Sequence, residues 1–138
     1  MTLGTFNGSA TALLEETGRL SLPKVFYKSI DEDERDLLYL AVDGHKRCIL
    51  AYPKSQWEGR MKKLTDLDHE DNEEVLRKMR LLQRSMKTVK IDKQGRFYLP
   101  PEMKERVSLG REVELLGLST YFEIWSPNNL DQYEQSDS

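Results

Sequence analysis

The chain has 138 residues and a mass of 16.1 kDa, enough for one compact domain or two very small ones that share a core. Its hydrophobic share of 38%, with Trp 2, Tyr 6 and Phe 4, excludes wholesale disorder. The formal charge of −3 argues mildly against a nucleic-acid partner, whose binders usually carry a basic face. Two histidines and one cysteine leave little material for a zinc site or a cysteine nucleophile, so we expect no enzyme, no catalytic residue, no metal and no cofactor.

Membrane and secretion features are also sparse. No apolar run approaches the roughly 20 residues of a membrane-spanning helix, and the first five residues lack the basic and apolar regions of a signal peptide. Because Cys48 is the only cysteine, no intramolecular disulfide can form. These features favour a cytoplasmic protein with no membrane partner and no small-molecule substrate.

The charges are segregated along the chain. Residues 77–96 contain eight basic side chains and one acidic one, Asp92, a net charge of +7. Acidic residues collect at 31–34, at 66–74 and after 131. This distribution can give an acidic protein one positive face. The alternative is a solvated helix with basic residues at its C-terminal end, where the helix dipole favours them.

The first unit of the chain begins with a tight hairpin. Glu15 and, three residues later, Gly18 predict a type I turn with the glycine in the left-handed region, closed by a glycine bulge. Pro23 follows where a short helix can start, since proline is tolerated at the first helical position. A second hairpin is expected, with strands over 37–42 and 48–52.

Helices close the first unit and join it to the next. Pro53 opens a helix that carries apolar residues on one face, namely Trp57, Met61 and Leu64. The longest helix is expected from about Asp71 to Met86, with acids at its start and bases at its end, as the dipole prefers. Its apolar stripe consists of Val75, Met79, Leu82 and Met86.

The second unit repeats this order. Its first hairpin turns from Asp92 to Gly95, between strands expected over 87–91 and 97–99. The remaining elements are a short helix after Pro100, strands over 113–118 and 121–125, and a helix opened by Pro127 with Ser126 as its cap. The predicted pattern is β-β-α-β-β-α, twice.

The repetition is visible in the residues themselves. EETGRLSLP at 15–23 and DKQGRFYLP at 92–100 share the form acid-x-x-Gly-Arg-apolar-x-Leu-Pro at a spacing of 77. Residues 48–53 match 121–126 at a spacing of 73. The difference of four predicts a longer loop in the first copy, around 31–36. The chain is therefore a tandem of two similar units.

These residues resemble the MraZ family of bacterial regulators, which are built from two SpoVT/AbrB-type swapped-hairpin units. The family's Asp-x-x-Gly-Arg-apolar-x-Ile/Leu-Pro element is matched at 15–23 and at 92–100. Its Leu-Tyr-Pro-x-x-x-Trp segment is matched at 51–57, and its Phe-Glu-Leu-Trp at 122–125. The resemblance covers nearly the whole chain, from Phe6 through the terminal helix.

The resemblance implies both a fold and a domain organisation. The fold is α+β and β-rich, with two AbrB-like swapped-hairpin units packed as one pseudo-twofold domain. The first unit is expected over 5–65 and the second over 87–134, with a linker helix over 66–86 between them.

The resemblance also implies a function. It indicates a DNA-binding transcriptional regulator of the division and cell-wall gene cluster, which acts in the cytoplasm and on the nucleoid. The family forms ring-like oligomers that bind short direct repeats of double-stranded DNA upstream of its own operon, and its glycine-arginine hairpins supply the DNA contacts. Carried over by position, the expected contact residues are Arg19 and Arg96, with Lys93 and Lys24 beside them.

The chain departs from the family in its first unit. Glu15 replaces the usual Asp, and Asn7 and Val25 stand where many members have Arg, so this unit carries less positive charge. Either arginine can instead bond the nearby acid, Glu15 or Asp92, or pair between the units. A faint cation-site pattern over 66–71 lacks the central glycine of a calcium loop, which favours an acidic linker.

Three other functions compete with the regulator. An oligomeric scaffold that has lost DNA affinity agrees with the acidic pI of about 5.5. An enzyme is disfavoured, because the chain shows no nucleophile–base–acid set and no phosphate-cradling loop. A different AbrB-type regulator, such as an antitoxin, would usually carry one unit per chain rather than two.

Overall fold

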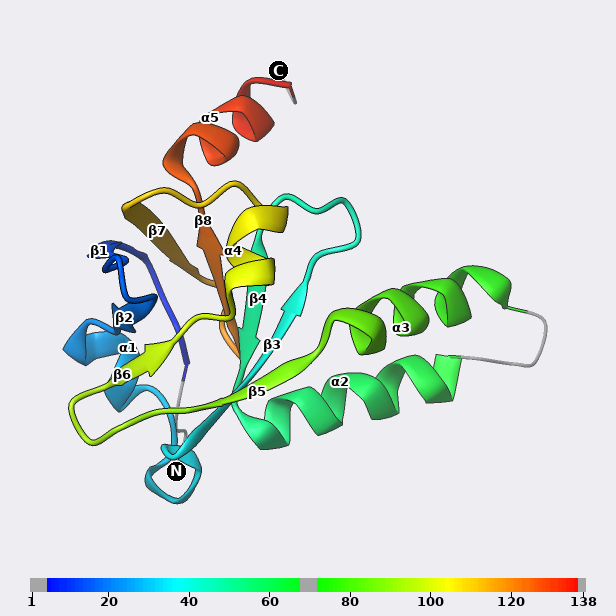
Figure 1. The fold of residues 1–138 in the computed structure, drawn as a ribbon. Coiled ribbons are helices and arrows are strands. Elements are labelled where there is room, and N and C mark those ends of the chain that lie inside the picture. The colour runs from blue at the N-terminus through cyan, green and yellow to red at the C-terminus, as the bar shows by residue number, and fades with distance from the viewer. Residues whose placement is uncertain (1–4, 68–71, 137–138) are drawn as a thin grey trace.

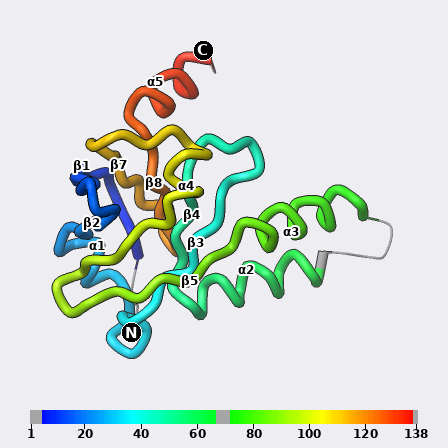
Figure 2. Tube along the Cα trace, in the orientation of Figure 1, coloured from blue at the N-terminus to red at the C-terminus, as the bar shows by residue number. Residues whose placement is uncertain are grey.

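The computed structural model describes residues 5–67 and 72–136. A central antiparallel sheet carries a small two-stranded ribbon on one side and a pair of helices, α2 (Lys54–Leu67) and α3 (Glu73–Ser85), on the other (Figure 1). The trace in Figure 2 shows α2 and α3 side by side, standing off from the sheet as a pair. Among the described residues, no helix is long and apolar enough to span a membrane.

The two copies of the repeat exchange strands. The sheet runs in the order β1-β7-β8-β4-β3-β5, whose bounds in that order are Ser9–Leu13, Glu112–Gly117, Phe122–Trp125, Ile49–Tyr52, Leu37–Val42 and Lys87–Lys90. Strand β1 of the first copy pairs with β7 of the second, and β5 of the second pairs with β3 of the first. The equivalent strands β4 and β8 meet at the centre. The predicted α+β, β-rich fold with a pseudo-twofold arrangement is therefore confirmed.

The spacing of the sequence repeat is preserved in the elements. Strand β2 (Arg19–Ser21) and strand β6 (Arg96–Tyr98) lie 77 residues apart, and β4 and β8 lie 73 apart. The first copy has one extra element, the 3-10 helix η1 (Glu32–Glu34), in the acidic segment. The predicted longer loop is thus confirmed. The unit boundaries at 65 and 87 stay predictions, because strand exchange joins both copies in one sheet.

The helices correct two expectations. Pro23 and Pro100 are N-caps with extended backbone, ψ 149° and 130°, and α1 (Lys24–Lys28) and α4 (Pro101–Arg106) begin one residue later. Helix α2 has 14 residues and α3 has 13, so α3 is not the longest helix. In the last turns of α2, the Thr65 hydroxyl donates to the Met61 carbonyl at 2.9 Å and Lys62 lies 3.8 Å from Asp66. The faint cation pattern falls mainly on residues 68–71, which lie outside the described residues.

Both faces of the sheet are apolar, so the core has two layers. Toward the ribbon and the short helices, Phe6, Phe26 and Phe122 form an aromatic trio with ring centroids 5.1 to 6.0 Å apart. The opposite face packs against α2, α3 and the terminal helix α5 (Pro127–Ser136). The predicted stripe of α3 is confirmed there: Leu82 is buried, and Val75, Met79 and Met86 pack around the same cluster.

Gly117 marks a close approach between β7 and the N-terminal segment. Its backbone N–H donates to the Gly8 carbonyl at 2.8 Å, and Phe6 and Ser119 exchange two backbone hydrogen bonds beside it. A Cβ on Gly117 would lie 2.5 Å from the Phe6 carbonyl carbon and 2.6 Å from the Asn7 nitrogen. Backbone atoms cannot move aside as flexible side chains do, so this position requires glycine.

We expect Gly117→Ala to destabilise the fold by about 1–3 kcal/mol, because the N-terminal segment must shift away from β7. Urea unfolding followed by circular dichroism measures this loss. Gly59→Ala on α2 is the control: its Cβ meets nothing within 4 Å, and alanine should raise helix stability by roughly 0.5–1 kcal/mol. A Gly117→Ala protein as stable as the parent would contradict the close approach.

Candidate nucleic-acid interface

The ribbon is formed by one short strand from each copy. Strands β2 and β6 pair antiparallel with Arg19 opposite Tyr98, Leu20 opposite Phe97 and Ser21 opposite Arg96. Side chains alternate along a strand, so Leu20 and Phe97 both point into the core, where they are buried. The four residues beside them share the outer face of the ribbon: Arg19, Ser21, Arg96 and Tyr98. Both predicted arginines therefore lie on one exposed face.

The turns have the predicted geometry. The N–H of Gly18 donates to the Glu15 carbonyl at 2.8 Å, and Gly95 donates to Asp92 at 3.0 Å. Both glycines have positive φ, 92° and 81°, a conformation that side chains disfavour. The acid's N–H then bonds the arginine carbonyl at 2.9 Å in each copy, which closes the bulge. The type I turn with a glycine bulge is confirmed in both copies.

Beyond these turns the hairpins open, which agrees with the swapped-hairpin units that the resemblance implies, although no local pattern indicated which strands pair. Strands β1 and β5 enter the large sheet, whereas β2 and β6 form the separate ribbon. Each turn is instead held by the other copy: the Leu22 N–H donates to the Gly95 carbonyl, and the Leu99 N–H donates to the Gly18 carbonyl, both at 2.9 Å. These two equivalent bonds fix the position of each turn relative to the other.

Each arginine forms an ion pair with the acid of its own turn, the alternative that the sequence left open. Nε and Nη2 of Arg19 donate to the two carboxylate oxygens of Glu15 at 3.1 and 3.2 Å, and this hydrogen bond raises the pKa of Arg19. Nε of Arg96 donates to Asp92 at 2.7 Å, and its Nη2 donates to Gln94 at 3.2 Å. The arginine side chains remain 34% and 36% exposed. Neither Nη1 is hydrogen-bonded to another described residue.

The two turns differ in how the acid is used. Oδ1 of Asp92 accepts from the backbone N–H groups of Gln94 and Arg96 at 2.9 and 3.0 Å. The bond from the Arg96 backbone, followed by the Arg96 side chain, holds the pKa of Asp92 below its usual range. The Glu15 carboxylate accepts only from the Arg19 side chain among the described residues, because its extra methylene carries it away from the turn backbone. The second turn is therefore the more firmly built.

The remaining predicted residues lie near this face. Lys93 is an exposed residue of the second turn, and Lys24 is the exposed first residue of α1. Neither forms an ion pair within the described part of the chain. Val25 on α1 is 69% exposed, so an apolar side chain lies on the surface where many family members have an arginine. The sequence interpretation missed Tyr98, 61% exposed on the ribbon, although the alternation of Arg96, Phe97 and Tyr98 could have shown it.

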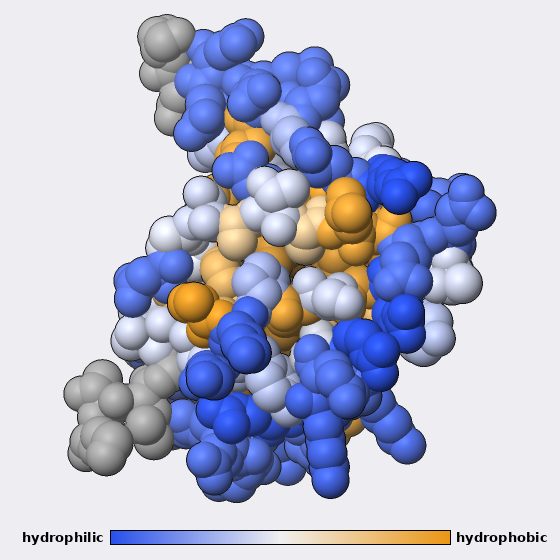
Figure 3. Space-filling view, turned by 90° about the vertical axis from the view of Figure 1, so that its left-hand side faces the viewer, coloured by the Kyte–Doolittle hydropathy of each residue, from blue (hydrophilic) through white to orange (hydrophobic). Residues whose placement is uncertain are grey.

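The surroundings of the ribbon are partly apolar. Figure 3 shows the side of the molecule on which β1 and β2 lie, with hydrophobic residues in the middle and hydrophilic ones around them. Leu13 on β1 is 55% exposed, and β1 is an edge strand of the sheet. The basic run from Arg77 to Arg84 lies instead entirely on α3, away from the ribbon (Figure 1).

Known proteins resemble this chain over most of its length. The family model described as "MraZ protein, putative antitoxin-like" matches residues 84–138. A protein of Hydrogenovibrio crunogenus named "Transcriptional regulator MraZ" is 34% identical over 126 residues, which cover 91% of this chain and 82% of that protein. Proteins of the same name from Thermomicrobium roseum and Pseudoalteromonas translucida are 32% identical (90% of this chain, 83% of theirs) and 26% identical (96% and 87%).

This name is that of a regulator, which is not an enzyme class. The repeated glycine-arginine turns and the exchanged strands agree with the resemblance seen in the sequence. With 34% identity maintained over 91% of its length, this chain belongs to the MraZ family.

Proposed function

We propose that this protein is a transcriptional regulator that binds double-stranded DNA with the outer face of the β2–β6 ribbon. The observation that supports this is the register of the ribbon, because it brings Arg19 and Arg96 from two separate repeats to one exposed face. The name of the relatives agrees with this function. In the cell we place the protein in the cytoplasm, on the nucleoid.

The carboxylates give the arginines a defined orientation. Holding Nε of Arg96 on Asp92 leaves Nη1 directed away from the turn, and it reduces the conformational freedom that the side chain would lose on binding. A planar guanidinium can bond a phosphate or two acceptors of guanine in the major groove. Lys93 and Lys24 then add phosphate contacts beside it. In this proposal Asp92 and Glu15 are positioning residues for the DNA-binding arginines.

The same carboxylates limit the affinity of a single chain. The ribbon carries both signs of charge and the whole chain has a net charge of −3, so one copy should bind DNA weakly. A ring of copies bound to direct repeats overcomes this, since linked sites raise affinity by roughly 10²–10⁴ when geometry allows. We propose such a ring, bound upstream of the division and cell-wall gene cluster. Exposed Leu13 on the edge strand β1 supports self-association.

The second candidate is an oligomeric scaffold without DNA affinity. The ion pairs at both arginines favour it, because they show that each guanidinium has a partner within its own turn. The two functions differ in one property that can be measured directly, the binding of duplex DNA at low salt.

We expect Arg96→Gln to weaken binding of a labelled duplex from the protein's own upstream region by about 1–3 kcal/mol, with Arg19→Gln acting in the same direction. If Arg96 neutralises a phosphate, the magnitude of the salt slope should also fall by about 0.9 in the variant. Fluorescence anisotropy across a salt series measures both. Arg80→Gln on α3, whose partner is Glu73 at 3.4 Å, is the control for a simple change of charge.

Size-exclusion chromatography should give one size for all of these proteins, because the substituted side chains lie on β2, β6 and α3 and not on the edge strand β1 of the proposed subunit contact. Normal binding by Arg96→Gln would show that the site is wrongly placed. No binding by the parent protein at low salt would favour the scaffold.

We expect Asp92→Asn to lower stability in a pH-dependent way. The pKa of Asp92 is lower in the folded state, so its charged form stabilises the fold above the unfolded pKa, about 4, and this stabilisation is lost as pH falls through the folded pKa. The gap in urea midpoint between parent and variant should be constant near neutral pH and should close in acid. Glu15→Gln should lower stability at neutral pH by less than Asp92→Asn does, because no backbone N–H of its turn donates to the Glu15 carboxylate. If the difference in urea midpoint between parent and Asp92→Asn persisted in acid, the stabilisation would not come from the negative charge of Asp92.

A further inference from the structure

A cleft separates the helical pair from the central strands of the sheet. It has two adjoining parts of about 500 and 350 Å³, which share Arg60, Lys78 and Tyr121. Both volumes lie in the range of about 300–1,000 Å³ that is usual for small-molecule sites. Leu50 and Tyr52 of β4 line the cleft and belong to the core layer that faces α2 and α3. The cleft is thus on the opposite face of the sheet from the ribbon.

Two hydrogen-bond donors buried behind the wall of the cleft have no partner among the described residues. Tyr52 is 1% exposed, and its buried hydroxyl is not hydrogen-bonded to any described residue. The buried Nε of Arg60, on α2, is likewise without a partner among the described residues. Burial raises the pKa of Tyr52, so its hydroxyl is a protonated donor at neutral pH. Buried polar groups are nearly always satisfied in native proteins, and one acceptor between these residues could serve both.

The lining of the cleft is positively charged although the chain is acidic. Five basic and three acidic residues line it, which leaves a net charge of +2. The basic residues are Arg47, Arg60, Lys63, Arg77 and Lys78, and the acidic ones are Asp43, Glu74 and Glu123.

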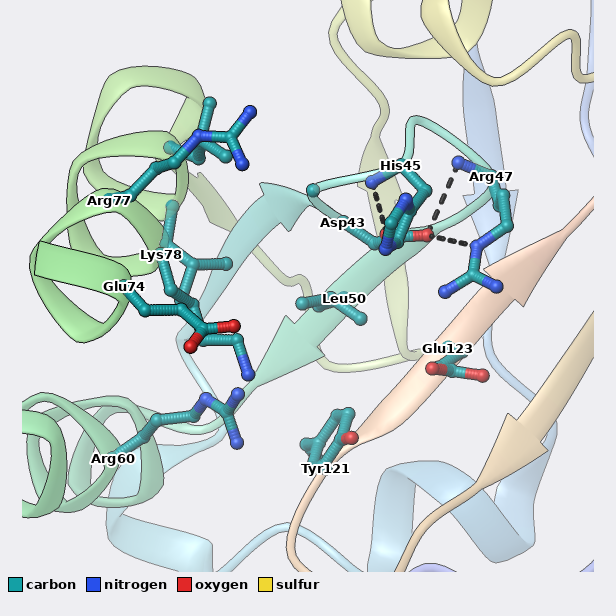
Figure 4. Close-up of a pocket in the computed structure, with 13 residues that line it drawn as sticks. Asp43, His45, Arg47, Leu50, Arg60, Glu74, Arg77, Lys78, Tyr121 and Glu123 are labelled. Carbon is teal, nitrogen blue, oxygen red and sulfur yellow. Dashed lines mark hydrogen bonds and ion pairs between the residues drawn. The ribbon is translucent and has the colours of Figure 1, made fainter.

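The acids are partly engaged. Asp43 pairs with Arg47 at 3.3 Å, and Glu123 accepts from the indole of Trp125 at 2.8 Å. Figure 4 shows Arg60 and Lys78 pointing from α2 and α3 into the space before the strands, with the exposed Glu74 carboxylate beside them. The two basic heads therefore come together in the part of the cleft that both volumes share.

An aromatic wall completes the site. The rings of Tyr52 and Tyr121 stack with centroids 4.6 Å apart and an interplanar angle of 12°. Tyr121 is only half-buried and lines both parts of the cleft. The stack fixes the Tyr52 ring behind Tyr121, and the half-buried Tyr121 ring offers a flat apolar surface next to the basic side chains.

We propose that this cleft binds a small phosphorylated ligand, whose phosphate oxygens contact the head groups of Arg60 and Lys78. Arg60 is only half-buried, and a shift of its side chain on binding gives a phosphate oxygen access to the Tyr52 hydroxyl and to Nε of Arg60. Lys63 supplies further positive charge. A phosphate monoester carries about −1.5 to −2 at neutral pH and three acceptor oxygens, which suits a net lining charge of +2 and donors that converge from two elements. A planar group on the ligand would lie against Tyr121. The ligand is bound, not transformed, so no substrate is implied.

The test uses the full chain without DNA, so its outcome is independent of the proposed DNA binding. Inorganic pyrophosphate and ATP are the probes, and thermal unfolding and isothermal calorimetry are the measurements. Both probes should raise the unfolding midpoint in a concentration-dependent way, since a ligand that binds only the folded state stabilises it. ATP should bind more tightly than pyrophosphate if its ring lies on Tyr121.

Tyr52→Phe is the decisive variant. It retains the ring stack and removes only the unpartnered hydroxyl, so the free protein should be as stable as the parent or more stable. Its affinity for pyrophosphate should nevertheless fall roughly ten-fold, the value of a hydrogen bond to a charged group. Arg60→Gln should weaken binding at least as much. Lys62→Gln, on the solvent side of α2 with its charge paired to Asp66, is the matched control and should bind normally.

Three results would overturn the proposal. The first is no stabilisation of the parent protein by either probe at millimolar concentration, in which case water alone satisfies the two donors. The second is equal binding by the parent, Tyr52→Phe and Arg60→Gln proteins, which would show non-specific attraction of anions. The third is a change of oligomeric size in Arg60→Gln without phosphate binding, which would make the cleft a contact between copies of the chain.

Discussion

Two backbone hydrogen bonds link the repeats at their turns and fix the arrangement of the ribbon. Leu22 and Leu99 each donate to the turn glycine of the other copy, Gly95 and Gly18, at 2.9 Å. Such bonds require that a carbonyl of each turn face the other repeat, which only a left-handed glycine allows without strain. They also require that the strand after each turn leave its own hairpin. The strand exchange in the sheet is the other consequence of the same constraint, since β1 and β5 are then free to pair with the opposite copy.

This constraint explains why the ribbon can hold arginines beside carboxylates on an exposed face. Ion pairs at the surface contribute little to stability because water and salt screen them, so Glu15 and Asp92 have mainly an orienting effect on the side chains. Orientation is useful only if the turn itself does not move, and the inter-repeat bonds supply that rigidity. The two carboxylates do not orient their arginines equally well. Asp92 accepts from the turn backbone as well as from Arg96, whereas Glu15 reaches only the Arg19 side chain among the described residues.

Local patterns predicted much of this structure. The spacings of 77 and 73 placed the elements of both copies, and the acid-x-x-Gly pattern predicted the turn type, because these features depend on neighbouring residues. Pairing between distant strands is a different matter, since nothing near β1 indicates that its partner is β7. Alternation along β6 could have shown that Tyr98 is exposed, but its place opposite Arg19 on the combined face of β2 and β6 depends on the register between the strands. The cleft was harder still to predict: Tyr52, Arg60, Lys78 and Tyr121 come from four separate segments, and the motifs that contain the two tyrosines do not indicate that these four residues meet.

The cleft and the ribbon lie on opposite faces of one sheet, yet one continuous stretch of chain joins them. Helix α3 carries Lys78 into the cleft and ends at Ser85, whose hydroxyl accepts from the Val42 N–H of β3 at 2.8 Å. The chain then enters β5 without a loop, and β5 leads directly to the turn that holds Arg96. A group that draws α3 toward α2 would therefore pull on a strand anchored at Ser85. The pairing of β5 with β3 resists such a displacement and so holds the turn that carries Arg96 in place.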